Sequence, residues 1–182
     1  MARSSPLHAQ RKPSAVQPYG RELQPVLLER LTDDRVDQRR EPDGAFLLTR
    51  TMLRESVLRD LRWLLNTIHM ETTDDLAAFG QVRQSVLNYG IGALAGQLIA
   101  ELEWSDIESS IREAIVQFEP RILADSLRVR CLADNLNQGH HNILSLELSG
   151  ELWCIPYPLE FIFRSEIDLE CGYIVLRSLG AE

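Results

Sequence analysis

Apolar residues recur at steps of three and four in two stretches of the chain, and each stretch predicts an amphipathic helix. The first stripe comprises Leu53, Val57, Leu61, Leu64, Leu65 and Ile68. The second comprises Ile107, Ile111, Ala114, Ile115 and Phe118. Glu55 and Arg59 are placed to form an i,i+4 ion pair on the wet face of the first helix. Ser105 and Glu108 fit a capping box at the start of the second.

After Pro120 the apolar period changes to two, which is typical of strands with one buried face. The expected buried positions are Leu123, Leu127, Val129 and Cys131, followed by Leu144, Leu146, Leu148, Leu152 and Cys154. Gly150 predicts a bulge, residues 135–142 predict a hairpin loop, and two more strands are expected at Leu159–Phe163 and Tyr173–Arg177. Helices followed by closely spaced strands predict an α+β fold, with the helices packed on one face of a small antiparallel sheet of about four strands.

The pattern also divides the chain into parts. Residues 1–21 hold prolines and basic residues with little to bury, so we expect a disordered tail. Residues 22–48 form an arm, with a short helix at Leu23–Leu31 that has Pro25 in its first turn, and a charged linker from residue 32 to residue 44. The α+β domain is expected at residues 49–182.

Charge is spread unevenly over these parts. Residues 1–62 hold 12 basic and 9 acidic side chains, whereas residues 63–182 hold 7 basic and 18 acidic. An acidic main domain repels phosphate backbones, so we expect no nucleic-acid partner. Residues 1–5 are polar and no apolar run approaches the roughly 18 residues of a membrane helix, so we expect neither a secretory signal nor membrane insertion, and a cytoplasmic location.

Residues that commonly hold metals or cofactors show no matching pattern. The cysteines fit no metal framework or disulfide scaffold, and we expect reduced core or sheet residues at Cys131, Cys154 and Cys171. No metal-ligand spacing surrounds the histidines, which are His8, His69, His140 and His141. The turn that contains Gly90, Gly92 and Gly96 does not match the sequence motif of a phosphate-binding or dinucleotide-binding loop. The sequence therefore predicts no metal and no cofactor.

Catalytic arrangements are equally absent from the pattern. No G-x-S-x-G elbow occurs, and no histidine and aspartate frame a nucleophile. Glu119 is the best single candidate for a catalytic acid, but a neighbouring Arg121 would favour its ionised form, which does not suit a general acid. We expect a protein that is not an enzyme and has no catalytic residues.

The junction at Phe118–Ile122 carries the most information. Pro120 lacks an N–H and disfavours the helical conformation of Glu119, so the second helix is expected to end there. Arg121 opens the strand pattern with a side chain that can bind a carboxylate through two parallel hydrogen bonds. Strand phase places Arg121 on the buried face with Leu123, which leaves Glu119 as the outward member. The junction is therefore either a docking point or an internal ion pair.

Several short motifs follow one another in a fixed order between residues 27 and 178. They are Leu28–Asp33, Ser56–Leu61, Leu64–Thr67, Ser85–Gly90, Phe118–Arg121, Glu166–Asp168 and Gly172. As an ordered set they resemble the TssE family, the baseplate subunits of bacterial type VI secretion systems. More distantly they resemble the "lysozyme-like" wedge proteins of contractile phage baseplates. The chain departs from the family pattern at Ile68 and Gln81, where an arginine and a proline are usual.

The resemblance implies a structural function without catalysis. It implies a baseplate subunit that links wedge subunits (TssF, TssG and TssK-like) to the contractile sheath (TssB and TssC-like), and that offers a sheet edge from which the sheath starts to assemble. It implies that Glu119, Pro120 and Arg121 bind the partner, and that the protein works in the cytoplasm at the inner membrane. Two alternatives stay open: a peptidoglycan-cleaving glycosidase, and a cytosolic adaptor of the same fold.

Overall fold

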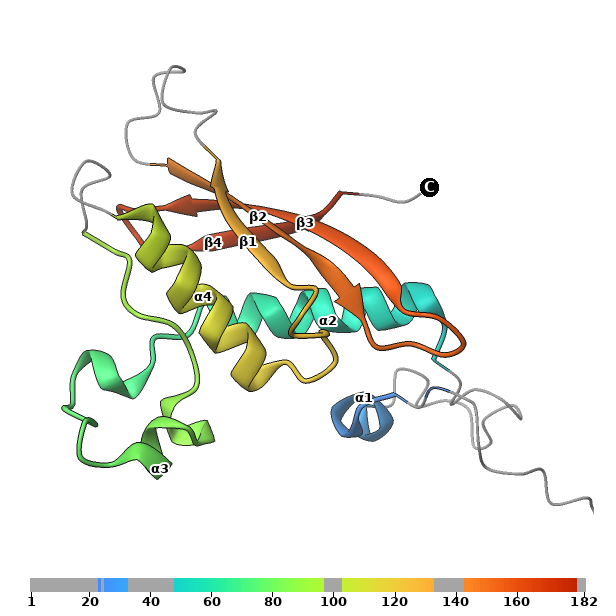
Figure 1. The fold of residues 1–182 in the computed structure, drawn as a ribbon, viewed down its shortest axis with the longest axis horizontal. Coiled ribbons are helices and arrows are strands. Elements are labelled where there is room, and N and C mark those ends of the chain that lie inside the picture. Colours follow the sequence, from blue (N-terminus) through green and yellow to red (C-terminus); the bar gives the residue numbers. More distant parts are fainter. Residues whose placement is uncertain (1–22, 24, 33–47, 97–102, 133–142, 180–182) are drawn as a thin grey trace, which may run out of the picture.

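The computed structural model describes residues 23, 25–32, 48–96, 103–132 and 143–179. Within these ranges, four strands form one antiparallel sheet in the order β1-β2-β3-β4, which confirms the predicted α+β class (Figure 1). The elements are α1 (Leu27–Leu31), α2 (Arg50–Leu65), η1 (Met70–Thr72), α3 (Gly80–Arg83), η2 (Val86–Asn88), α4 (Trp104–Phe118), β1 (Arg128–Leu132), β2 (Ile143–Leu152), β3 (Leu159–Asp168) and β4 (Ile174–Ser178). The tail at 1–21, most of the linker at 32–44 and the loop at 135–142, with His8, His140 and His141, lie outside the described residues.

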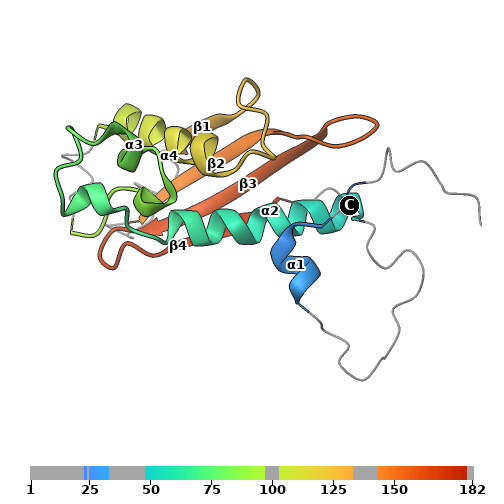
Figure 2. The same ribbon diagram turned by 90° about the horizontal axis from the view of Figure 1, so that it is seen from below.

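One face of the sheet carries the core, and α2 and α4 cover it (Figures 1 and 2). α2 packs on β3 and β4, while α4 packs on β1. Inward-facing Phe163 of β3 is fully buried, as are Leu61 of α2 and Ile115 of α4. Burying one such side chain stabilises the fold by roughly 1.5–3 kcal/mol. Apart from Ile68, both predicted apolar stripes therefore face the sheet, and its outer face carries mostly polar residues.

α2 ends earlier than the apolar pattern predicted, because its last turn bonds to the edge of β4. Asn66 donates from Nδ2 to the carbonyl of Ile174 and accepts at Oδ1 from the N–H of Ile174, both at 2.9 Å. Arg62 donates two hydrogen bonds to the carbonyl of Leu176, at 3.0 and 2.8 Å. Ile68, which was expected on the buried stripe, lies beyond the helix and is 61% exposed. Helix side chains thus cover part of this sheet edge.

The capping box predicted at the start of α4 is wrong. The helix begins at Trp104, and its N-cap residue Glu103 makes no side-chain bond. Glu108 instead accepts a hydrogen bond at 2.7 Å from the backbone N–H of Cys131, on the outer edge of β1. This carboxylate satisfies a donor that has no neighbouring strand.

Burial, followed by the charge of Glu108, raises the pKa of Cys131 to about 11, so its thiol stays protonated near neutral pH.

Two details of the predicted strands are also wrong. The first strand begins at Arg128 and not near Leu123, because residues 124–126 form a turn. Gly150 forms no bulge, since β2 pairs with β3 without interruption from Ile143 to Leu152. A Cβ added at Gly150 would lie 3.3 Å from Cα of Leu127. The glycine therefore allows close packing under an unbroken strand.

Two smaller expectations differ as well. The first helix begins at Leu27, so Pro25 precedes it and does not lie in its first turn. Cys171 is exposed in the turn between β3 and β4, whereas Cys154 is buried as expected.

Gly90 allows two segments to cross closely after α2. The carbonyl of Thr67 accepts a hydrogen bond from the N–H of Ile91 at 2.9 Å. Gly90 has φ of +128°, and a Cβ there would lie 2.3 Å from the same carbonyl oxygen.

We expect Gly90→Ala to lower the free energy of unfolding by about 1–3 kcal/mol in urea titrations, because it adds backbone strain and a clash. Gly80→Ala is the control, because its Cβ would meet nothing within 4 Å. Equal losses in the two variants would contradict this explanation.

Candidate protein-binding site

The junction after α4 has the backbone that Pro120 dictates. α4 ends at Phe118, and Glu119 takes a non-helical conformation with φ of −120° and ψ of 79°. Pro120 lies exposed in the turn that follows. The chain then returns to the sheet, where the carbonyl of Arg121 accepts a hydrogen bond at 2.7 Å from the N–H of Trp153. The predicted end of the helix is confirmed, and the junction is fixed on both sides.

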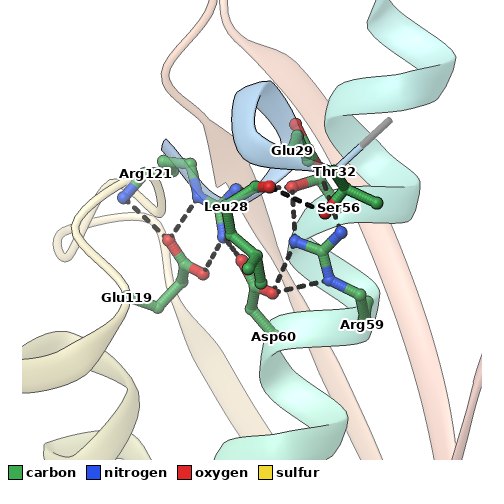
Figure 3. A network of polar contacts seen from close by, with 8 residues as sticks. All are labelled: Leu28, Glu29, Thr32, Ser56, Arg59, Asp60, Glu119 and Arg121. Atoms are coloured by element: carbon green, nitrogen blue, oxygen red, sulfur yellow. Dashed lines mark hydrogen bonds and ion pairs between the residues drawn. The ribbon is translucent and has the colours of Figure 1, made fainter. Parts of the chain in front are cut away.

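The side chain of Arg121 joins the junction to α2 (Figure 3). Its Nε donates to Oε1 of Glu119 at 2.7 Å, and its Nη2 donates to Oε2 of the same carboxylate at 2.5 Å. Nη2 also donates to Oδ2 of Asp60 at 2.5 Å, and Nη1 donates to Oγ of Ser56 at 2.8 Å. Four of the five guanidinium N–H donors therefore have an acceptor. A bidentate pair of this kind fixes geometry as well as charge.

A second arginine extends the network to α1 (Figure 3). Arg59 donates from Nε and Nη2 to Oδ1 of Asp60, at 2.9 and 2.8 Å. Its Nη1 donates to Oε1 of Glu29 on α1 at 3.2 Å. The sequence predicted Glu55 as the partner of Arg59, but Glu29 and Asp60 take that place. Asp60 thus bridges two arginines, and the five charged residues form one network: Glu29, Arg59, Asp60, Glu119 and Arg121.

Burial within this network reverses the expected orientation of Glu119. The residue is only 4% exposed, so the expectation that it points outward is wrong. It turns under the junction because a buried carboxylate needs the charged donors that Arg121 supplies. The prediction that Arg121 faces the helices is confirmed by its bonds to Ser56 and Asp60. Its side chain remains 18% exposed, and that of Asp60 23%.

Electrostatics keep this arrangement charged. Burial alone would lower the pKa of Arg121. Its hydrogen bond with Glu119 and the negative charge of Glu119 act in the opposite direction, and so do the hydrogen bond with Asp60 and the charge of Asp60. Together these interactions outweigh burial, so the pKa of Arg121 is raised. Burial first, followed by the charges of Asp60 and Glu119, raises the pKa of Tyr89, which stays a neutral phenol near pH 7. The guanidinium therefore stays ionised at any pH where the protein is folded.

The arrangement suits recognition better than acid–base chemistry. Both oxygens of Glu119 accept bonds from Arg121, and the nearby carboxylate of Asp60 is bound by the same guanidinium. A glycosidase needs two carboxyl groups that face a substrate and a water molecule.

In the described ranges, no three His, Cys, Asp or Glu side chains are grouped to hold a metal ion. No helix among those described residues is long and apolar enough to cross a bilayer.

The part of the chain that builds this junction matches a known family. The profile of the family described as "Baseplate wedge protein gp25" matches residues 51–157, which hold α2, α4, the junction, β1 and β2. The chain belongs to this baseplate wedge protein family. It is therefore a structural component of a baseplate, as the ordered motifs indicated. Searches of curated proteins and of solved structures found no match.

Sequence reasoning found only part of the candidate site of this baseplate wedge protein. Glu119, Pro120 and Arg121 lie together at the junction as expected, but Ser56, Asp60, Arg59 and Glu29 were not predicted to join them. One signal was available. Ser56 and Asp60 are four residues apart, which places two polar side chains on one side of the helix, next to the buried stripe. Such a pair indicates a partner elsewhere in the fold.

Proposed function

We propose that this baseplate wedge protein is a non-enzymatic subunit of a type VI secretion system. In this proposal it joins wedge subunits of the TssF, TssG and TssK type to a contractile sheath of TssB- and TssC-like subunits. It works on the cytoplasmic side and is held at the inner membrane through its partners. The family match over residues 51–157 and the ordered motifs outside that range support the proposal.

The network around Arg121 is the observation that carries the proposal. Pro120 is exposed, and Asp60 and Arg121 keep part of their side chains exposed beside it. These residues would contact the wedge partner, while the buried Glu119 holds the guanidinium in position. An arginine fixed in this way can meet the carbonyl end of a partner helix, where cations are favoured. Glu119 therefore acts in partner binding from inside the fold.

Contact with the sheath would use the edge of the β-sheet. An incoming strand needs unpaired backbone groups, and α2 already occupies those of Ile174 and Leu176 on β4. On β1, the N–H of Cys131 donates to Glu108 of α4, and this is the only hydrogen bond between a helix side chain and the edge of β1 among the described residues. We therefore place the strand of the sheath subunit at β1.

Purification of the tagged chain from its native host tests the proposal. Mass spectrometry of the recovered complex should identify wedge subunits and sheath subunits together. Recovery of a single regulatory protein without them would favour the cytosolic adaptor and contradict the baseplate assignment.

A peptidoglycan-hydrolysis assay addresses the glycosidase alternative. We expect no clearance by the purified protein, because Arg121 occupies both oxygens of Glu119. Clearance that is lost in a folded Glu119→Gln variant would overturn the non-enzymatic assignment.

A further inference from the structure

The outer face of the sheet concentrates the basic residues of an acidic domain. Residues 63–182 hold only 7 basic side chains against 18 acidic ones. Four of those seven are exposed on strands, at alternating positions that point away from the helices: Arg128, Arg130, Arg164 and Arg177. We call these four residues the arginine face. Since α2 and α4 cover the opposite side of the sheet, none of them belongs to the junction site (Figure 2).

Strand register aligns three of these arginines in one row. Arg130 pairs with Glu147, Glu147 with Arg164, and Arg164 with Arg177 across the four strands. Arg164 and Arg177 thus lie directly opposite each other, which is unfavourable for like charges. The row holds one acidic residue, and Glu147 pairs with Arg164 at 3.1 Å.

The other three members of the arginine face have no ion pair with any described residue. Glu166 lies in the next row, opposite Val175, and makes no ion pair with described residues either. Glu151 and Glu160 face each other two rows beyond the row of three arginines and one row beyond Arg128, which lies opposite Ser149. Between described residues, Arg164 is therefore the one member of the arginine face whose charge is met by an ion pair.

We propose that the arginine face binds an acidic helix of a partner protein, and that this helix lies across the strands. Neighbouring strands are about 4.8 Å apart, so the row from Arg130 to Arg177 spans about 14 Å. A helix rises about 4.5–6 Å over three or four residues, which matches the strand spacing. Carboxylates at positions i, i+3 and i+10 would then lie over Arg177, Arg164 and Arg130, with a neutral or basic residue over Glu147.

An extended segment fits this row less well. Its side chains on one face repeat about every 6.8 Å, which differs from the 4.8 Å between strands. The exposed apolar side chains of Ile162 and Val175, 47% and 37% exposed, lie in the rows on either side. They would contact the apolar flanks of an amphipathic helix. Phosphate backbones are a poorer match, because the domain around the arginine face is acidic.

A photo-crosslinking residue at Ile162 tests this proposal in the full-length chain. The chain is expressed in its native host and irradiated, and the cross-linked partner peptide is sequenced by mass spectrometry. We expect one peptide with Asp or Glu at helical spacing. We expect its yield to fall at least about tenfold in the Arg164→Glu/Arg177→Glu variant, because attraction becomes repulsion. Raising NaCl from about 50 to 500 mM should weaken the same cross-link without any mutation.

Arg83→Glu/Arg112→Glu is the matched control, because it changes net charge equally at exposed positions elsewhere. Its cross-link yield should stay within about twofold of the parent. No cross-link, a peptide without the acidic pattern, a nucleic-acid adduct, or equal losses in both variants would overturn the proposal. Wedge and sheath subunits are scored in the same purification. Their recovery without the cross-link would refute this inference alone and leave the baseplate assignment in place.

Discussion

Glu119→Ala should lower the free energy of unfolding by about 3–5 kcal/mol. The carboxylate is only 4% exposed and accepts three hydrogen bonds, two from the guanidinium of Arg121 and one from its backbone N–H. Its removal leaves a mostly buried cation with fewer acceptors, which costs far more than the loss of an exposed ion pair. Urea unfolding at constant pH, followed by circular dichroism, measures the change.

Glu113→Ala supplies the comparison for this experiment. Glu113 is an exposed acidic residue of α4, so its replacement should change stability by less than about 0.5 kcal/mol. If Glu119→Ala also fell within that range, the network could not be a main stabilising feature of the junction.

Arg121→Ala should remove both stability and partner binding. The substitution leaves Glu119 buried without its bidentate partner, and Asp60 keeps one of its two arginine partners. We therefore expect the free energy of unfolding to fall by about 3–5 kcal/mol. It also removes the guanidinium that we propose to contact the wedge subunits. Recovery of those subunits by the tagged variant, measured beside its urea unfolding, gives both effects.

Arg121→Lys separates charge from geometry at the same position. Lysine keeps the cation but cannot make the two parallel bonds to Glu119, so the positioning of the charge is lost. We expect partner recovery between those of the parent and the alanine variant. Full recovery with lysine would show that charge alone is sufficient.

The fold was predictable wherever one periodicity ran without interruption. The stripe from Leu53 to Leu65 and the alternation along β2 placed the core correctly, because each depends on local sequence alone. The errors lie where a distant partner decided the local structure. Asn66 ended α2 by bonding to Ile174, which is 108 residues away in the sequence. Glu108 does not cap α4 as expected, because it accepts a hydrogen bond from the N–H of Cys131 at the edge of β1.

The candidate site was predictable only where it depends on residues that are close in the sequence. Pro120 fixed the end of the helix, and the alternation of the strand gave the direction of Arg121 correctly, although a turn interrupts the strand itself. Glu119 was misplaced, because its orientation depends on a cation held against α2. Asp60 lies 61 residues before Arg121, and no spacing within one element reveals a pair that far apart. Only the fold brings the two charges together.

The most direct test of the central claim removes the network's charges at the junction while preserving its packing. Glu119→Gln/Arg121→Met replaces the pair with neutral side chains of similar size, so stability should stay within about 1–2 kcal/mol of the parent. The matched control is Arg112→Met/Glu113→Gln, the same exchange at exposed positions on α4.

Wedge-subunit recovery from the native host is the measurement, with each tagged chain expressed at equal level. We predict at least about a tenfold loss for the junction variant and less than about a twofold change for the control. Undiminished recovery by a folded junction variant would contradict the proposal that the Arg121 network binds the baseplate partner.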